Sequence, residues 1–196
     1  MKIIGGEFKG RRIEIPKGVQ LRPTSDKVRE ALFNIIKDRV IGASVLDLFA
    51  GTGSLGLEAL SRGAKSVTFI DLHKRCVDTI KKNLRELQID SAGKARVHNN
   101  DAFKALRKLG DLKSKFDLIF LDPPYYDNMT KKSLMYICNY DILNPSYLII
   151  CEHFKKDPMP DKVECLTNVR QARYGDTVLT FYAGNRDEKS GIPRDI

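Results

Sequence analysis

The sequence lacks the features that mark three broad classes of protein. Its four cysteines, Cys76, Cys138, Cys151 and Cys165, are scattered and form no C-x-x-C pair. This spacing argues against a metal site and a disulfide framework, so we expect reduced and mostly buried thiols. No stretch approaches the roughly 20 apolar residues that a membrane-spanning helix needs, and the start, MKIIGGEFKGRR, turns polar too soon for a signal peptide. We therefore expect a cytoplasmic protein that binds no metal.

Basic side chains are in excess and are unevenly distributed. The 196 residues carry a formal net charge of +9, with a pI of about 9.4. Residues 1–40 hold ten Lys and Arg side chains against five acidic ones, which is +5 of that +9. Such a bias is expected of a protein that binds a polyanion. On charge alone, a solvated basic face without a partner is the alternative.

The stretch Val45–Gly56, VLDLFAGTGSLG, has the pattern of a strand, a tight loop and a helix. An apolar run meets a carboxylate at Asp47, then becomes glycine-rich at Gly51 and Gly53, and continues as a segment suited to a helix. Glycines permit positive φ and let a ligand approach the backbone closely. The first turn of the following helix offers free N–H groups. The stretch therefore predicts a loop that binds a nucleotide-type cofactor.

Two cofactors compete for this loop. Gly51, Gly53 and Gly56 spell the dinucleotide fingerprint, and Asp71 follows at about the distance of a ribose-binding acid. Asp47 argues against NAD, because a carboxylate just ahead of the loop would repel a pyrophosphate. It suits S-adenosylmethionine, which has an ammonium, a sulfonium and no phosphate. The sequence D-x-F-A-G-T-G resembles motif I of the class I methyltransferases, so we favour S-adenosylmethionine.

From Val45 onward, apolar runs typical of strands alternate with segments of helical spacing. This alternation predicts an α/β fold with a doubly wound, Rossmann-like sheet that is mostly parallel. Two strand-like runs in succession near the end predict a hairpin and an antiparallel last strand. We expect strands at 45–49, 66–70, 95–98, 116–121, 147–151, 162–167 and 177–182, and helices at 54–62, 73–87, 102–109 and 131–140.

Ahead of this region lies a small basic extension. Short strands at 2–4 and 12–15 suggest a hairpin. Thr24 or Ser25 is suited to cap a helix at 26–38, whose apolar residues share one face. We expect residues 1–42 to form this extension, 43–183 to form the main domain, and 184–196 to be a flexible tail.

Four acidic residues follow successive predicted strands: Asp47, Asp71, Asp101 and Asp122. In a sheet of this kind, ligands bind at the carboxyl ends of the strands. Asp71 can accept hydrogen bonds from ribose hydroxyls, Asp101 from an adenine amino group, and Asp47 suits the methionine ammonium. Asp71 or Asp101 taken singly could instead be a helix N-cap.

The run Asp122-Pro123-Pro124-Tyr125 is the second specific signal. The prolines fix φ and remove two N–H donors, so the loop offers only acceptors: the Asp122 carboxylate and nearby carbonyls. A rigid row of acceptors beside an aromatic ring suits a planar group that bears an NH2. The acceptors would bind the amine hydrogens and aim the nitrogen lone pair, while Tyr125 stacks on the base. Asp122 could take the released proton or pass it to water.

These pieces together resemble one family. Motif IV of the amino-methyltransferases is D/N-P-P-Y/F, as at Asp122–Tyr125. With GGEFKGRR at 5–12, LRPTSDKVREALFN at 21–34 and the stretch 47–56, the chain resembles the RsmD family to about residue 183. Those bacterial enzymes methylate a guanine exocyclic N2 amine in small-subunit ribosomal RNA, using S-adenosylmethionine.

The resemblance implies roles for particular residues. The catalytic loop would be Asp122, Pro123, Pro124 and Tyr125. The cofactor would be held by Asp47, Phe49, Ala50, Gly51, Thr52, Gly53, Asp71, Leu72, Asp101 and Ala102. RNA would be contacted by Lys9, Arg11, Arg12, Arg22, Thr24, Lys27 and Arg29, with the 22–29 segment closing over cofactor and substrate. We expect a monomer whose partner is ribosomal RNA, naked or in the small ribosomal subunit.

Other classes account for less of the sequence. A DNA adenine methyltransferase shares the D-P-P-Y chemistry but usually carries a further target-recognition domain, for which the chain has no room. A protein-glutamine methyltransferase typically has Asn where Asp122 stands. An RNA-binding or assembly factor would explain the charge but neither cofactor-type loop. The DNA and protein substrates are the alternatives that remain open.

Overall fold

A computed structural model describes residues 1–19, 24–89, 93–124 and 128–184. The chain divides into two compact units, Met1–Ala102 and Phe103–Ile196. Residues 1–42, which the sequence sets apart as an extension, belong to the first unit. The predicted tail lies almost wholly outside the described residues.

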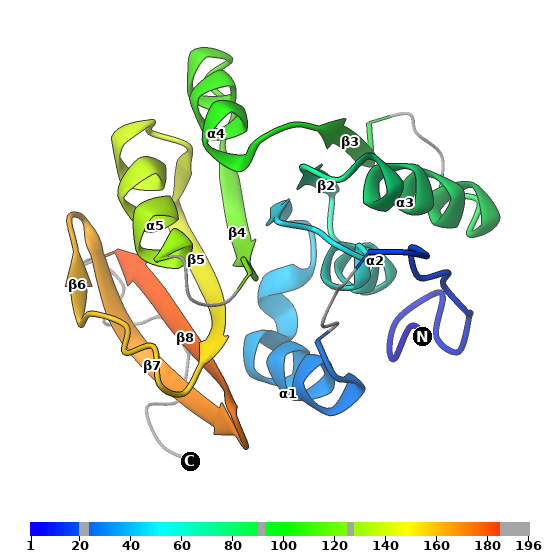
Figure 1. Cartoon of the computed structure of the whole chain (residues 1–196), viewed down its shortest axis with the longest axis horizontal. Helices are drawn as coiled ribbons and strands as arrows, with labels where there is room; N and C mark the ends of the chain where they lie inside the picture. The colour runs from blue at the N-terminus through cyan, green and yellow to red at the C-terminus, as the bar shows by residue number, and fades with distance from the viewer. Residues whose placement is uncertain (20–23, 90–92, 125–127, 185–196) are drawn as a thin grey trace. The chain divides into compact units, whose positions relative to one another are not determined.

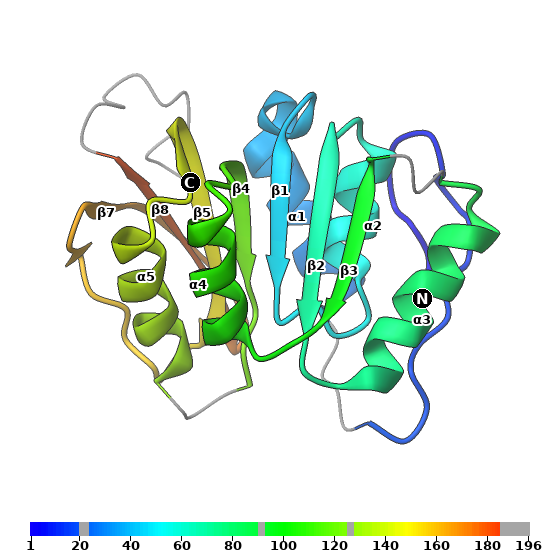
Figure 2. The same ribbon diagram turned by 90° about the horizontal axis from the view of Figure 1, so that it is seen from above.

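The first unit is built around parallel strands. Strand β1 (Ser44–Leu48) pairs with β2 (Ser66–Asp71), and β2 pairs with β3 (Ala95–Asn99). Figure 2 shows the three side by side and pointing the same way. β1 is buried throughout except at its first residue, as expected of a strand covered on both faces. Because the strands are parallel, Asp71 and Asn99 end the paired stretch at the same edge.

Helices α2 (Ser54–Ser61) and α3 (Lys74–Glu86) connect these strands and pack on them. Helix α2 is buried along its whole length, whereas α3 is amphipathic and buries Val77 and Ile80. Helix α1 (Asp26–Ile36) begins at Ser25, whose hydroxyl accepts a hydrogen bond from the Val28 N–H at 3.2 Å. A 3-10 turn, η1 (Lys37–Val40), follows it.

The N-terminal segment runs alongside α2 and α3 (Figure 1). The expected hairpin is present in a short form. Lys2 and Arg12 form an antiparallel bridge, the Ile3 N–H donates to the Arg11 carbonyl at 3.0 Å, and the Ile13 N–H donates to the Met1 carbonyl at 3.1 Å. The same segment binds α2, where the Glu7 N–H donates to the Ser61 carbonyl at 2.7 Å. At Gly6, φ is +77°, and a Cβ there would lie 1.8 Å from the Ser61 carbonyl oxygen. Gly6 is therefore needed for the close approach of this backbone to the end of α2.

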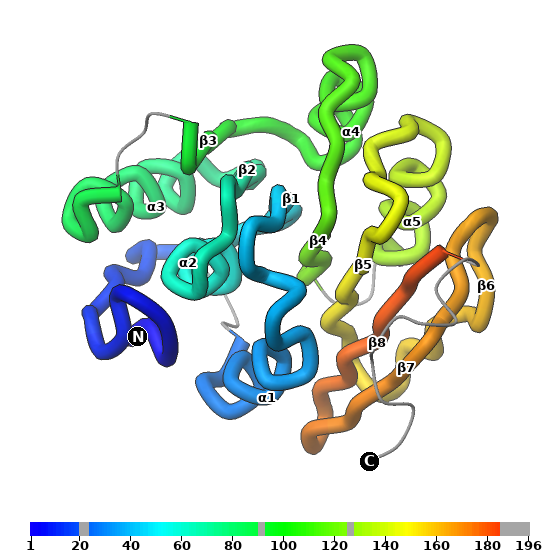
Figure 3. The backbone as a smooth tube through the Cα atoms, turned by 180° about the vertical axis from the view of Figure 1, so that it is seen from behind, coloured from blue at the N-terminus to red at the C-terminus, as the bar shows by residue number. Residues whose placement is uncertain are grey.

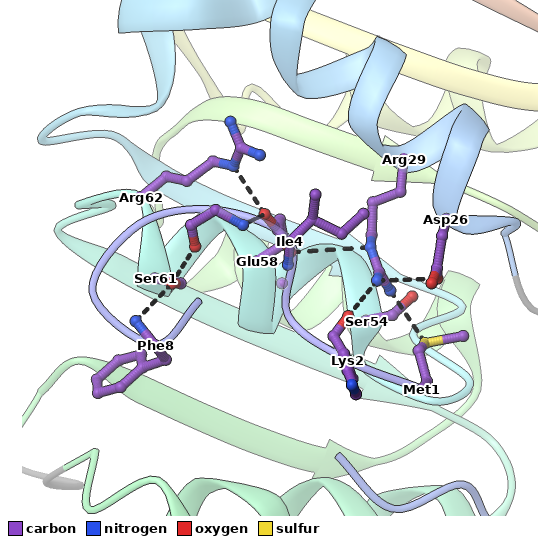
Figure 4. Close-up of polar contacts among 12 residues, drawn as sticks. Met1, Lys2, Ile4, Phe8, Asp26, Arg29, Ser54, Glu58, Ser61 and Arg62 are labelled. Carbon is purple, nitrogen blue, oxygen red and sulfur yellow. Dashed lines mark hydrogen bonds and ion pairs between the residues drawn. The ribbon is translucent and has the colours of Figure 1, made fainter. Parts of the chain in front are cut away.

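One buried carboxylate organises these contacts (Figure 4). Glu58 of α2 is fully buried and accepts hydrogen bonds from the N–H groups of Ile4 at 2.8 Å and Gly5 at 2.7 Å. The Nε of Arg62 donates to it at 2.8 Å, and the Nε of Arg29 lies 3.8 Å away. A buried charge is tolerated when its lone pairs are occupied in this way. Glu58 thus holds the N-terminal segment and α1 against α2.

The second unit combines parallel and antiparallel pairing, and Figure 3 shows β8 lying between β5 and β7. Strand β4 (Phe116–Leu121) pairs with β5 (Leu143–Phe154) in parallel, and β5 pairs with β8 (Thr177–Gly184) antiparallel. Strands β6 (Lys162–Val163) and β7 (Leu166–Tyr174) complete the antiparallel edge. The helices are α4 (Ala102–Asp111), which spans the division between the units, and α5 (Met129–Asn139).

The predicted fold class is confirmed: a mixed α/β fold with parallel strands and an antiparallel edge. The strand expected at 162–167 is wrong in extent. It is a two-residue strand, a turn and then the nine-residue β7. Burial along β7 does not alternate regularly, and a bulge lies between Asn168 and Arg170. The two-residue period that marks a strand is therefore not visible in this part of the sequence. The predicted terminal hairpin is present as β7 and β8.

Replacing Glu58 by Ala is expected to lower the unfolding free energy by about 3–5 kcal/mol, because the buried Arg29 would lose its buried partner and keep only the exposed carboxylate of Asp26. Urea denaturation measures this change, and hydrogen exchange at the Ile4 and Gly5 amides should accelerate. Glu14→Ala is the matched control, because its carboxylate is half exposed and pairs with Lys82 on the surface. The control should change stability far less. Equal effects of the two variants would contradict the role of Glu58.

Candidate functional site

The loop after β1 has a backbone that ordinary residues rarely adopt. Phe49, Gly51 and Gly53 have φ values of 68°, 52° and 74°. A positive φ at an aromatic residue is uncommon, and such outliers concentrate at functional sites. The Gly53 N–H donates to the Ala50 carbonyl at 2.7 Å, which closes a tight turn directly before α2. The predicted strand, glycine-rich loop and helix are thus present as expected.

Asp47 lies beneath this loop and is only 3% exposed. Its Oδ2 accepts a hydrogen bond from the Gly56 N–H at 2.9 Å, in the first turns of α2. A Cβ on Gly56 would lie 2.9 Å from the same oxygen and 2.2 Å from the Phe69 ring. Because Gly56 has no side chain, α2 packs closely on β1 and β2, and the Gly56 N–H reaches the Asp47 carboxylate.

Burial dominates the ionisation of Asp47. Loss of solvent raises the pKa of this carboxyl to about 7, the Gly56 N–H opposes the shift, and the negative charge of Asp71 adds to it. A cationic group bound beside Asp47 would favour the ionised form. A phosphate there would raise the pKa further, so the electrostatics suit a cationic ligand.

Asp71 shapes the same loop from the end of β2. Its Oδ2 accepts from the Gly51 N–H at 2.7 Å, and its Oδ1 accepts from the His73 N–H at 2.7 Å. The bond from the His73 N–H forms a local turn directly before α3. It resembles the N-cap role that the sequence left open as an alternative for Asp71. A carboxylate oxygen has more than one lone pair, so these bonds leave acceptor capacity for a ligand hydroxyl. Asp71 is thereby placed on the glycine-rich loop.

Asn99 is a residue of this edge that the sequence did not assign. Its Nδ2 donates to the carbonyl of Asp71 at 3.2 Å and to that of Leu72 at 2.7 Å. It joins the ends of β2 and β3, next to the predicted cofactor residues Leu72 and Asp101. The pair Asn99-Asn100 at the end of a predicted strand was the available signal, because amides at strand ends commonly bind neighbouring backbone.

The other predicted cofactor residues lie within this loop or just after the ends of β2 and β3. Leu72 is 64% exposed, which is unusual for a leucine beside polar groups. Asp101 is partly exposed, with its N–H donating to the Asn100 side chain at 2.9 Å. Ala50, Thr52 and Ala102 are buried. The first unit thus brings together Asp47, the residues 49–53, Asp71, Leu72 and Asp101.

In the second unit, Asp122 and the two prolines follow directly after β4. Asp122 is partly exposed, Pro123 is buried and Pro124 is exposed. Both prolines line a cavity of about 110 Å³. Tyr125, which the sequence predicts as a stacking ring, lies outside the described residues.

The basic residues predicted to bind RNA fall into two groups. Lys9, Arg11, Arg12 and Lys27 are exposed. Arg29 differs from the expectation, because its guanidinium is completely buried. It pairs with Asp26 at 3.1 Å and binds the carbonyl of Lys2, so it supports the N-terminal segment and offers RNA no surface.

Thr24 is likewise buried, at 3% exposure. Arg22 lies outside the described residues. Within the described ranges, no group of three or more His, Cys, Asp or Glu side chains is placed to hold a metal ion. In those ranges, too, every helix is too short or too polar to cross a membrane.

Comparison with known proteins identifies the family and the relatives of this chain. The family model described as "Conserved hypothetical protein 95" matches residues 1–183. Ribosomal RNA small subunit methyltransferase D of Haemophilus influenzae is 39% identical over 159 residues, which cover 81% of each chain. The Escherichia coli protein of the same name is 36% identical over 160 residues, covering 82% of this chain and 78% of that one.

Solved structures show the same fold. The structure of yhhF from Escherichia coli has a TM-score of 0.83 and 34% identity, and covers 94% of this chain and 97% of its own. SMU.776, solved in complex with SAH, has a TM-score of 0.64 and 19% identity, and covers 80% of this chain and 48% of its own. At that identity, the second likeness concerns the fold alone.

The raised pKa of Asp47 predicts a specific dependence of stability on pH. Between the ordinary carboxyl pKa and about 7, the unfolded chain releases this proton while the folded chain keeps it. Rising pH therefore favours unfolding. Asp47→Asn removes this penalty, so the variant should gain about 2–3 kcal/mol relative to wild type between pH 5 and pH 8.

Urea unfolding of both proteins across this pH range measures the difference. Asp78→Asn is the control, because Asp78 is exposed and its ion pair with Lys74 lies on the surface of α3. The control should track wild type at every pH. A constant difference between Asp47→Asn and wild type would show that the carboxyl titrates outside this range.

Proposed function

This chain belongs to the RsmD family of methyltransferases, and from that premise we propose that it methylates the exocyclic N2 amine of a guanine in small-subunit ribosomal RNA. Its class is that of an rRNA methyltransferase, as its relatives' names state. The choice of guanine, of N2 and of the residues that act is the proposal. The Asp122-Pro123-Pro124 run directly after β4 is the single observation that carries it.

S-adenosylmethionine fits the first unit. When bound, it supplies an electrophilic methyl group on a sulfonium and leaves as S-adenosylhomocysteine. The loop Phe49–Gly53 allows close backbone approach, and ionised Asp47 provides the negative charge that an ammonium needs. Asp71 would accept from the ribose hydroxyls, Asp101 from the adenine amine, and the exposed Leu72 would lie against the adenine ring. A pyrophosphate cofactor would meet two carboxylates, Asp47 and Asp71, at the same loop.

Asp122 and the following prolines would orient the acceptor amine. The Asp122 carboxylate and the carbonyls of Asp122 and Pro123 would offer acceptors to the amine, and a hydrogen bond to one of them would direct the nitrogen lone pair outward. As the N–C bond forms and the sulfonium C–S bond breaks, the nitrogen becomes acidic. Asp122 then takes the proton or passes it to water. Tyr125 would stack on the target base.

The exposed N-terminal basic residues would bind the RNA backbone. Lys9, Arg11, Arg12 and Lys27 are all exposed in a region of excess positive charge. Contacts of this kind steer association and position the substrate without reading its sequence. We propose that the substrate is the assembling or assembled small subunit, and that the enzyme acts as a cytoplasmic monomer.

The proposed function is tested by methyl transfer from labelled S-adenosylmethionine to small ribosomal subunits that lack the modification, followed by nucleoside analysis. Label in N2-methylguanosine is the expected result. Label in an adenine nucleoside would keep the D-P-P-Y chemistry and overturn the choice of guanine. Label on DNA or protein, with none on RNA, would overturn the RNA substrate.

Asp122→Ala should lower kcat by at least about a hundredfold, because the amine would lose an acceptor and a proton acceptor together. Cofactor affinity, measured by calorimetry, should change by less than about twofold. Asp141→Ala is the control, since Asp141 is an exposed carboxylate of the same unit that pairs with Lys115. Full activity of Asp122→Ala would remove Asp122 from the reaction.

Replacing Arg11 and Arg12 by Ala should weaken binding to small subunits and reduce the slope of log K against log salt by up to about 2. The Arg11 guanidinium also donates to the Glu86 carbonyl at 2.7 Å, so the single Arg12 variant should be compared. Lys155→Ala with Lys156→Ala is the control, because both are exposed bases of the second unit. If the control lowers the slope equally, the N-terminal residues have no special part in binding.

A further inference from the structure

The cavity beside the D-P-P loop combines apolar and polar walls. The apolar lining is Pro123, Pro124, Met129, Pro158 and Met159, and the polar lining is Asn128, Thr130, Lys131, His153 and Asp157. Its volume is about 110 Å³, which is several times what one water molecule needs, so the cavity has room for a small organic group. Small-molecule sites commonly combine such walls with a few well-placed polar groups.

His153 also lines this cavity but contributes no charge to it. Its ring is 5% exposed, with Nε2 2.8 Å from the Thr180 hydroxyl and Nδ1 3.1 Å from the Phe154 carbonyl. Burial lowers the pKa of this imidazole, although the Phe154 and Asp157 backbone bonds and the Asp157 charge oppose the shift. Both ring nitrogens are therefore occupied and the ring is neutral at pH 7.

Lys131 and Asp157 are the two charged side chains among the residues that line the cavity. Lys131 comes from the first turn of α5, and Asp157 from the turn after β5, where its N–H donates to the Phe154 carbonyl at 2.9 Å. Both side chains are partly exposed. The cavity thus offers one charged acceptor and one charged donor, beside the apolar residues and the uncharged Asn128 and Thr130.

We propose that this cavity takes the target base and that Asp157 selects guanine there by accepting its N1–H and one N2–H, with Lys131 donating to O6. This inference rests on the proposed function and assigns the specificity of that site. The other N2 hydrogen is left for the acceptors of the Asp122-Pro123 loop. A carboxylate that accepts two parallel N–H bonds makes a short, charge-assisted contact.

The same arrangement rejects the other bases that carry an exocyclic amine. Adenine and cytosine each place an unprotonated ring nitrogen beside the amine, so one carboxylate oxygen would face a lone pair. Uracil has no exocyclic amine. Sites that require a particular hydrogen bond discriminate against analogues without it, because a polar group that the bound base covers is then left unpaired.

The pairing of a carboxylate with an ammonium could also hold a zwitterion, such as the methionine end of the cofactor. The two occupants differ in what Asp157→Asn does. If the cavity holds the base, cofactor affinity is unchanged and base selectivity shifts. If it holds the zwitterion, cofactor affinity falls and base selectivity stays the same, which would overturn the proposal.

The test uses small subunits assembled in vitro from transcribed ribosomal RNA that carry guanine or 2-aminopurine at the methylated nucleotide. 2-Aminopurine has only hydrogen at C6, so it brings no donor against Lys131. The analogue keeps the 2-amino group but has an unprotonated N1. Wild-type enzyme should methylate guanine and reject the analogue. Asp157→Asn presents an amide that can donate to N1 and accept from N2–H. Its preference for guanine over the analogue should therefore fall by between about tenfold and a hundredfold.

A gain of activity on the analogue is a result that mere loss of folding cannot produce. Asp161→Asn is the matched control, because Asp161 is an exposed carboxylate nearby that does not line the cavity, and it should keep the wild-type preference. Lys131→Gln should lower kcat/KM on guanine by about tenfold or more. Lys132→Gln, whose ammonium lies 4.4 Å from the centroid of the Phe103 ring, should not.

Each outcome bears on a separate claim. If Asp157→Asn keeps the wild-type preference, with or without a lower rate, the assignment of Asp157 is overturned. Methylation of guanine by the wild type upholds the proposed function in that case. Failure of the wild type to label guanine in these particles overturns the proposed function, and this inference with it.

Discussion

The first unit depends on one buried carboxylate, that of Glu58. It accepts from two backbone N–H groups of the N-terminal segment and from Arg62, and it pairs with the buried Arg29. Because an unpaired charge in this position would be costly, the segment, α1 and α2 are constrained together. Helix α2 begins at the glycine-rich loop, so this constraint also limits how far that loop can move.

The loop itself is held by two further carboxylates from neighbouring strands. Asp47 binds the Gly56 N–H and Asp71 binds the Gly51 N–H, so backbone donors that could meet a phosphate are already turned toward carboxylates. Their proximity raises the pKa of Asp47 beyond the effect of burial. A loop of this kind is prepared for a ligand that brings positive charge and hydroxyl groups, in contrast to a dinucleotide site.

Part of the site could be predicted because its signals are local. Asp47, the glycines and the Asp122-Pro123-Pro124 run each follow an apolar strand, and the family match confirms the resemblance that they carry. Arg29 could not be assigned from its charge, since an arginine in a basic helix looks the same whether it meets RNA or a buried Glu58. Lys131 and Asp157 are separated by β5 in the chain, so nothing local marks them as lining one cavity.

The sequence by itself determined the α/β fold class and the order of most strands and helices. It also determined the glycine-rich loop after β1 and the Asp122-Pro123-Pro124 loop after β4. These follow from periodicity and from the backbone demands of glycine and proline, which act over a few residues. Only the tertiary structure decided that the N-terminal segment binds α2, that β7 is a full strand, and that Arg29 is buried. Each of these depends on partners distant in the chain, because burial and hydrogen-bond satisfaction are properties of the folded neighbourhood.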